Sequence, residues 1–217
     1  MVRPLPTIGP TVKVLAAPHF DGRLACELVY ANLERRWRAR TRTDGRRPSS
    51  EKWRWQRIPT LSEDNRSAEV SLEKLLISTA DDTWANAIPT ARGLFDDGGR
   101  KANVDLAHRS GATIAFVELK WASNHPAYAA FEIVGYAMAW AQARFRAEEM
   151  GYVTDGTLRP VLATNAARWC VLAPASFYAG WDAEQLARFA ASLDQGMNSF
   201  FTERLNSTCA NSQGLFC

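Results

Sequence analysis

The strongest constraint on the fold is a run of apolar and β-favouring residues at 113–121 (TIAFVELKW). Its length and composition are typical of a buried β-strand. A second strand-like run at 102–107 (ANVDLA) precedes it, and the four residues 108–111 between the two runs fit a hairpin connection. The sequence therefore predicts two adjacent antiparallel strands in the middle of the chain.

Helical patterns flank this pair of strands. The expected elements are, in chain order, a helix at 24–40, a helix at 65–79, a short strand within 84–95, the two central strands, a helix at 126–150, a buried strand at 167–173 and a helix from about Asp182. Pro126 suits the first position of its helix, and Gly151 suits the stop. This order predicts an α/β domain with a mixed central sheet flanked by helices.

The length of 217 residues allows one sizeable core with an extension. Gly, Pro and Ser residues punctuate 41–60, which marks the best candidate boundary. We therefore expect a basic N-terminal extension over 1–60 packed on a domain at 61–206, followed by a polar tail at 207–217.

Membrane, secreted and zinc-binding classes find little support. The apolar stretch 128–143 contains Glu132 and is shorter than the roughly 20 residues of a membrane span. The start of the chain lacks the pattern of a signal peptide, so we expect a cytoplasmic protein without a membrane partner. The four cysteines form no CxxC pair, and Cys170, within an apolar run, is expected to be a small buried side chain.

Positive charge is concentrated at residues 34–57, which carry ten Lys or Arg against three acids, a net charge of +7. The whole chain has a net charge of only +3, so this asymmetry suggests a polyanionic partner. The candidate contacts to nucleic acid are Arg46, Arg47, Lys52 and Arg54. The alternative is a solvated helix end and loop. Trp53 and Trp55 fit either stacking on bases or packing in a half-buried edge strand.

Three charged residues within the apolar strands are the best candidates for chemistry. Glu118 and Lys120 are two positions apart and so share one face of their strand. If the two central strands pair, Asp105 approaches Glu118 across them. Burying such charges is costly unless they are paired or bind something, and two adjacent carboxylates suit a divalent cation such as Mg²⁺. An exposed strand end with an ordinary ion pair is the alternative.

Asp105, twelve intervening residues and then Glu118-Leu119-Lys120 resemble the Asp…Glu-x-Lys signature of the PD-(D/E)XK nuclease superfamily. The expected order of elements over roughly 62–175 is similar to the core of that family, the restriction-endonuclease-like fold. The proline that names the motif is absent, since Val104 precedes Asp105.

The resemblance implies a role for each matching residue. Asp105 and Glu118 would bind Mg²⁺, or Mn²⁺ as a substitute, with the Leu119 carbonyl as a further ligand, and Lys120 would position the attacking water. Many family members add a glutamate on the first core helix, for which Glu69 is favoured here over Glu73 because it lies beside the apolar stripe.

Glu132 and Tyr136 share the spacing of a Gln-x-x-x-Tyr motif found in some members, with Glu in place of Gln. For these two we favour a helix flank and a half-buried phenol.

The resemblance implies a Mg²⁺-dependent endonuclease that hydrolyses phosphodiester bonds, with DNA favoured over RNA. The alternative is a catalytically inactive module of the same fold that binds nucleic acid or assembles with a partner. A homodimer remains open, because the apolar final helix suits either a core or a dimer interface.

Overall fold

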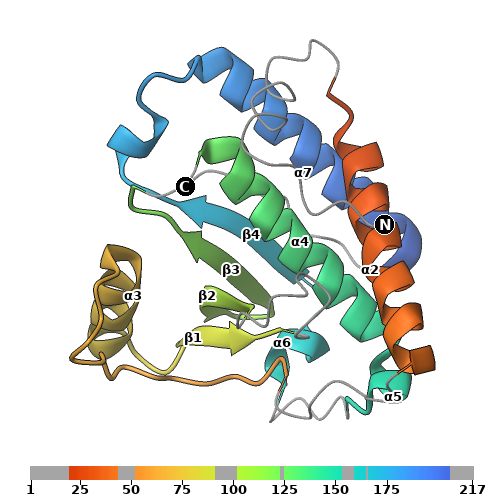
Figure 1. Cartoon of the computed structure of the whole chain (residues 1–217), viewed down its shortest axis with the longest axis horizontal. Helices are drawn as coiled ribbons and strands as arrows, with labels where there is room; N and C mark the ends of the chain where they lie inside the picture. The colour runs from red at the N-terminus through yellow and green to blue at the C-terminus, as the bar shows by residue number, and fades with distance from the viewer. Residues whose placement is uncertain are drawn as a thin grey trace.

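The chain forms an α/β structure with a four-stranded mixed sheet (Figure 1). The computed structural model describes residues 20–43, 52–90, 102–122, 125–152, 159–164 and 166–205. Its elements are α2 (Gly22–Thr43), α3 (Ala68–Thr79), β1 (Trp84–Pro89), β2 (Asn103–Ser110), β3 (Thr113–Leu119), α4 (Pro126–Phe145), α5 (Ala147–Met150), α6 (Pro160–Ala163), β4 (Ala166–Leu172), a 3₁₀ turn (Ala175–Tyr178) and α7 (Ala183–Leu205). Arg46, Arg47 and the tail 207–217 lie outside the described residues.

The strands are arranged in the order β1-β2-β3-β4. β1, β2 and β3 are antiparallel neighbours, whereas β4 runs parallel to β3. A parallel pair needs a crossover connection, which α4 and the short helices after it supply. The prediction of an α/β fold with a mixed sheet is therefore confirmed.

The central hairpin is tighter than the sequence pattern indicates. β2 continues to Ser110, which pairs with Thr113, so the link has two residues rather than the four expected at 108–111. Gly111 adopts a φ of +60°, a conformation that two-residue hairpin turns require and that glycine adopts without strain.

Helices cover both faces of the sheet (Figure 1). On one face, Phe116 of β3 and Trp169 of β4 stack with ring centroids 4.2 Å apart, and Trp140 of α4 packs edge-on against Trp169. On the other face, Ile77 of α3 packs with a small cluster that includes Leu106. The long apolar stretch of α4 is buried on nearly all sides because it lies between the sheet and a further layer of helices.

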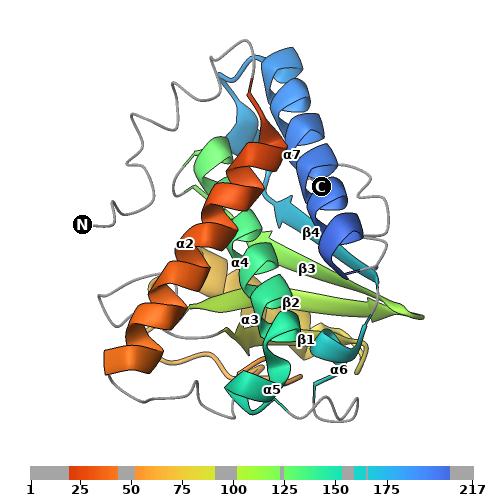
Figure 2. The same ribbon diagram turned by 90° about the vertical axis from the view of Figure 1, so that its right-hand side faces the viewer.

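That further layer consists of α2 and α7, which pack against each other and against α4 (Figure 2). Residues of α2 belong to the same hydrophobic core as α4 and the sheet, so this part of the N-terminal extension is integral to the fold; they are Cys26, Tyr30, Leu33 and Trp37. Glycines allow the close approach of the two helices. A Cβ on Gly196 of α7 would lie 2.3 Å from the Gly22 carbonyl carbon of α2.

The segment after residue 51 lies along the outer edge of β1. The Trp53 N–H donates to the Pro89 carbonyl at 2.6 Å, and the Asn86 N–H donates to the Gln56 carbonyl at 3.0 Å. Trp53 is fully buried, which favours packing over base stacking for this side chain. The segment therefore shields a sheet edge that would otherwise expose unpaired backbone groups.

Some local predictions agree with the structure and others differ from it. The helix expected at 126–150 is broken at Arg146 into α4 and α5, and Gly151 ends α5 with a φ of +68°. Asp182 caps α7 by accepting from the Gln185 N–H at 2.7 Å, as its spacing predicts. Cys170 is half-buried and disulfide-bonded rather than a small buried hydrophobic side chain.

Over the described part of the chain, we find no helix with the length and apolar character that a membrane span requires.

Candidate active site

Asp105 and Glu118 face each other where β2 and β3 separate. Leu106 pairs with Val117, so the next opposed positions in this antiparallel ladder are Asp105 and Glu118. The Asp105 side chain accepts a hydrogen bond from the Leu119 N–H at 2.8 Å. This bond fixes one carboxylate oxygen of Asp105 beside the backbone that carries Glu118.

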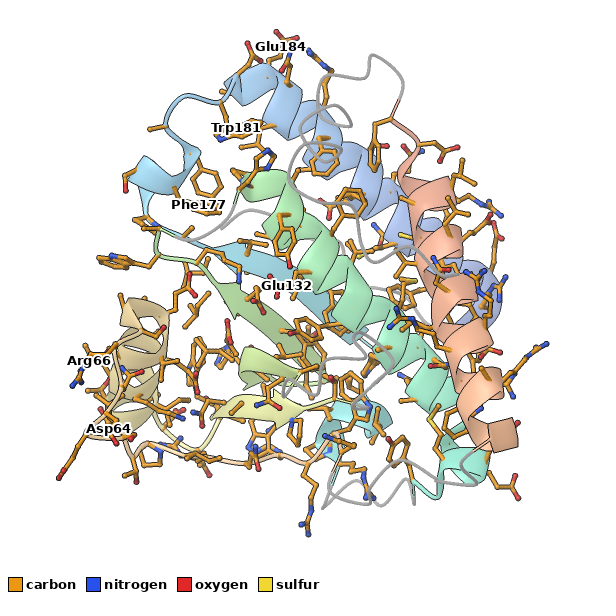
Figure 3. All side chains as sticks on the ribbon, in the orientation of Figure 1. Asp64, Arg66, Glu132, Phe177, Trp181 and Glu184 are labelled. Atoms are coloured by element: carbon orange, nitrogen blue, oxygen red, sulfur yellow. The ribbon has the colours of Figure 1, made fainter. Side chains whose placement is uncertain are left out.

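Lys120 is enclosed by two carboxylates. Its Nζ lies 2.6 Å from Glu118 Oε1 and 3.1 Å from Glu132 Oε2 of α4. The side chains of Glu118 and Lys120 are only 4% and 6% exposed. Figure 3 shows Glu132 directed from α4 toward the sheet. The second oxygen of Glu118 is buried without a hydrogen-bond partner, so it remains available to a ligand.

The pKa values of these groups reflect burial and crowding of like charges. Burial raises the pKa of Asp105 from 3.8 to about 7, although the Leu119 N–H and Lys120 oppose the shift. Burial also raises the pKa of Glu118 well above its ordinary value, and Asp105 and Glu132 add to this. Burial alone would lower the pKa of Lys120, but the surrounding carboxylates outweigh it and raise that pKa. The cluster thus holds more acidic groups than its single ammonium neutralises.

Tyr136 belongs to the same cluster. It lies one helical turn after Glu132 on α4 and is only 7% exposed. Burial raises its pKa, and the charges of Glu118, Glu132 and Asp105 raise it further, so its hydroxyl is a neutral donor close to these carboxylates. The sequence predicts a helix flank for Glu132 and a half-buried phenol for Tyr136. It carries no signal for the ion pair between Glu132 and Lys120.

The two candidate acids of α3 occupy different places. Glu69 accepts a hydrogen bond from the Trp121 N–H at 3.0 Å, just after the Glu118–Lys120 pair. Glu73 is 7% exposed, and its charge contributes to the raised pKa of Asp105. Both therefore lie near the cluster: the charge of Glu73 acts on Asp105, and Glu69 holds the backbone beside Lys120.

Asn86 of β1 holds Glu73 in place and was not anticipated from the sequence. Its side-chain amide is fully buried and donates to Glu73 Oε1 and to the Ile58 carbonyl. Its oxygen accepts from the Ile58 N–H at 2.7 Å, so all its polar atoms are used. A lone asparagine within a short strand carries no pattern that reveals such a contact.

Of the four basic candidates, Lys52 and Arg54 lie within the described residues. Lys52 and Arg54 are partly buried beside the β1 edge, and the Lys52 carbonyl accepts from Arg159 Nε at 3.1 Å.

The donor set fits a hard divalent cation in part. Asp105 and Glu118 supply two neighbouring carboxylates, and the buried, unpartnered Glu118 oxygen suits a cation. Among the described residues, the structure contains no group of three or more His, Cys, Asp or Glu arranged to hold a metal ion. A cation would therefore need the Leu119 carbonyl, water or substrate oxygens to complete its coordination, as Mg²⁺ commonly does.

Comparison of this chain with protein-family models, with curated proteins and with solved structures gives no match.

Proposed function

We propose that this protein is a Mg²⁺-dependent nuclease of the PD-(D/E)XK type that hydrolyses phosphodiester bonds, with DNA favoured as substrate. The observation that carries the proposal is the buried cluster of Asp105, Glu118 and Lys120 where β2 and β3 separate, with one Glu118 oxygen unpartnered. Burial of these charges is costly, and the cost is understandable if they bind a cation and a phosphate.

In this proposal each side chain has a separate task. Asp105 and Glu118, with the Leu119 carbonyl, would hold Mg²⁺, whose chemistry is to lower the pKa of bound water and neutralise charge on the phosphate. The raised pKa of Lys120 keeps its ammonium charged, which suits orientation of the attacking water and stabilisation of the charge that grows on the phosphate oxygens. Either acid of α3 could assist: Glu69 accepts from the Trp121 N–H beside Lys120, and the charge of Glu73 acts on Asp105.

A non-catalytic nucleic-acid-binding module is the second candidate. The observation that favours it is the double ion pair of Lys120, whose ammonium contacts both Glu118 and Glu132. An ammonium held in this way serves structural stability as well as catalysis, since it neutralises buried carboxylates.

A cleavage assay distinguishes the nuclease from the non-catalytic binding module. The purified chain is incubated with supercoiled plasmid and with single-stranded DNA, in Mg²⁺ or Mn²⁺. We expect metal-dependent cleavage that Lys120→Ala and Glu118→Gln abolish. Glu184→Gln is the matched control, because Glu184 is an exposed residue of α7 whose side chain is 83% exposed. Salt-dependent DNA binding without turnover would instead establish the binding module.

A further inference from the structure

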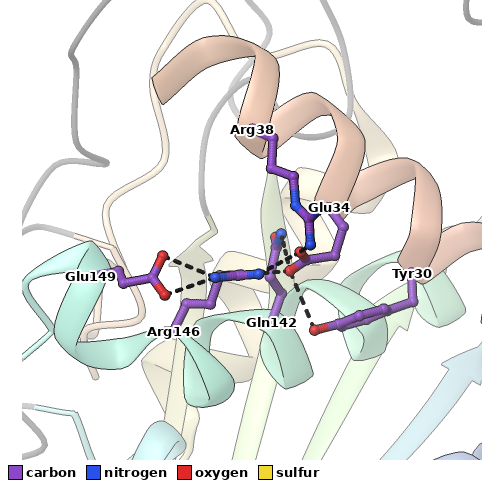
Figure 4. Close-up of polar contacts among 6 residues, drawn as sticks. All are labelled: Tyr30, Glu34, Arg38, Gln142, Arg146 and Glu149. Carbon is purple, nitrogen blue, oxygen red and sulfur yellow. Dashed lines mark hydrogen bonds and ion pairs between the residues drawn. The ribbon is translucent and has the colours of Figure 1, made fainter. Parts of the chain in front are cut away.

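A groove of about 890 Å³ lies along α2 and the end of α7, away from the carboxylate cluster. Its lining combines arginines, two acids and a tyrosine; the lining residues are Glu27, Tyr30, Ala31, Glu34, Arg35, Arg38, Ala39 and Arg204. The helix α4 separates the groove from the cluster, since Glu132 faces the sheet whereas Gln142 contacts Glu34 of α2 (Figure 4).

Both acids of the groove are engaged by arginines: Glu34 by Arg146 and, at 3.5 Å, by Arg38 of the lining, and Glu27 by Arg23. Glu34 forms two hydrogen bonds of 2.7 Å with Arg146, which also pairs with Glu149 (Figure 4). Hydrogen bonds to Arg146 and Gln142 lower the pKa of Glu34 despite its burial. Glu27 pairs with Arg23 at 3.1 Å. The two carboxylates are therefore compensated by Arg23, Arg38 and Arg146, and the lining as a whole carries three arginines against two acids.

The three arginines of the groove, Arg35, Arg38 and Arg204, differ in their contacts and exposure. Arg204 lies over the rings of Tyr30 and Phe200, 5.2 Å and 5.0 Å from their centroids. Such stacking fixes the guanidinium plane while its N–H edge stays free to donate. Arg38 is 74% exposed, and Arg35, one turn earlier on the same helix, is also exposed. Within the described residues, neither Arg35 nor Arg204 forms an ion pair with a carboxylate.

We propose that this groove binds the phosphate backbone of nucleic acid through Arg35, Arg38 and Arg204, as a site separate from the catalytic cluster. Planar guanidinium groups match phosphate oxygens bidentately, and arginines spaced along a helix can follow successive phosphates. The sequence of α2 also includes two further arginines, at positions 40 and 42, in its last turn. This inference takes one element from the proposed function, namely that the partner is nucleic acid.

The test measures binding without cleavage, so that its failure differs from failure of the nuclease proposal. The full chain is titrated with fluorescent duplex DNA in EDTA over a salt series, by anisotropy. The triple variant Arg35→Gln, Arg38→Gln, Arg204→Gln is expected to bind about tenfold or more weakly. Its slope of log affinity against log salt should fall by about 2 to 3, because roughly 0.9 of a counterion is released for each phosphate neutralised.

The matched control is the triple variant Arg66→Gln, Arg109→Gln, Arg188→Gln, which removes the same charge outside the groove lining. An equal loss of affinity in both triples would overturn the proposal, because general charge would then explain binding. Replacement of the three groove arginines by lysine keeps the charge but loses the bidentate contacts. It should therefore weaken binding less than the glutamine triple and leave the salt slope close to that of the wild type, which a purely structural role for the guanidinium groups would not produce. Binding to phosphatidylserine vesicles but not to duplex DNA would also overturn it.

Discussion

Lys120 is the one ammonium among several acidic side chains that crowd around it. Asp105, Glu118 and Glu132 all influence its pKa, and two of them contact its Nζ directly. Buried charges are tolerated only when they are paired, and here the acids outnumber the base. The excess negative charge must be relieved by protons when no cation is present, or by a cation when one binds. A cation bound as proposed would therefore compete with protons for the same carboxylates.

The first consequence is a pH-dependent stability in EDTA. The pKa of Asp105 is raised to about 7 in the folded chain from an ordinary 3.8, so its contribution to stability is complete below about 3.8 and is lost as pH rises through 7. We expect the free energy of unfolding of the wild type to fall relative to Asp105→Asn between these values, by up to about 1.4 kcal/mol per pH unit. Urea denaturation at several pH values measures this.

The control for that series is Asp64→Asn, an exposed turn residue. Its profile should run parallel to that of the wild type. If the Asp105→Asn profile is parallel as well, Asp105 is ionised normally in the folded chain and the account of its burial is wrong.

The second consequence is stabilisation by Mg²⁺. A cation that binds only the folded state adds about 2.7 kcal/mol at a concentration a hundredfold above its Kd. The melting temperature of the wild type should rise with Mg²⁺, whereas Glu118→Gln should respond little, because it loses the charge of the unpartnered oxygen. Differential scanning calorimetry at constant ionic strength provides the measurement, and an equal response in both proteins would place the cation elsewhere.

Glu132 should act by holding Lys120 in position. When Glu118 binds a cation, Glu132 remains as the second partner of the Lys120 ammonium. Loss of such an outer partner commonly costs about 10-fold to 100-fold in activity, so Glu132→Ala should lower kcat by that order with little change in KM. Glu132→Gln should retain more, since its amide oxygen still accepts from Lys120. Glu148→Gln, altered at an exposed residue, is the control and should leave kcat unchanged. If Glu132→Ala also leaves kcat unchanged, Glu132 does not position Lys120.

At the scale of elements, the sequence was most informative where periodicity and composition agreed. The strand pair and the Asp182 cap of α7 follow from local patterns, because each depends on residues close in sequence. The environments of Glu69 and Glu73 did not follow from spacing, because they depend on how α3 contacts other elements. Leu75 is 60% exposed, while Glu73 is turned inward by its contact with Asn86.

In the candidate site too, residues that stand out in the local sequence could be predicted, whereas residues defined by contacts between elements could not. Asp105, Glu118 and Lys120 could be identified because charged residues within apolar strands are conspicuous. Glu132, Asn86 and the groove arginine Arg204 depend on contacts between elements far apart in the chain, which no spacing rule encodes.

The contact between α2 and α7 gives a prediction in which two effects have opposite signs. Helix propensity alone makes Gly196→Ala stabilising by up to about 1 kcal/mol. The new Cβ, however, would lie 2.3 Å from the Gly22 carbonyl carbon, and overpacking of this kind costs about 1–3 kcal/mol or more. We expect a net loss of stability in chemical denaturation. A gain would show that the two helices do not approach this closely in solution.

At the scale of the whole molecule, part of the N-terminal extension shares the hydrophobic core of α4 and the sheet. Leu33, Trp37 and Trp53 are buried in the same core as α4 and β4, although they precede the expected domain at 61–206. Deletion of residues 1–60 would expose the apolar surfaces of α4 and α7 and the edge of β1. We therefore expect the fragment 61–217 to lose cooperative unfolding and to bind a hydrophobic dye, whereas full-length Leu28→Ser, altered at a side chain that is 56% exposed, should unfold as the wild type does. A fragment that unfolds cooperatively would instead make residues 61–217 an independent domain, with α2 and its arginine groove as a separable attachment.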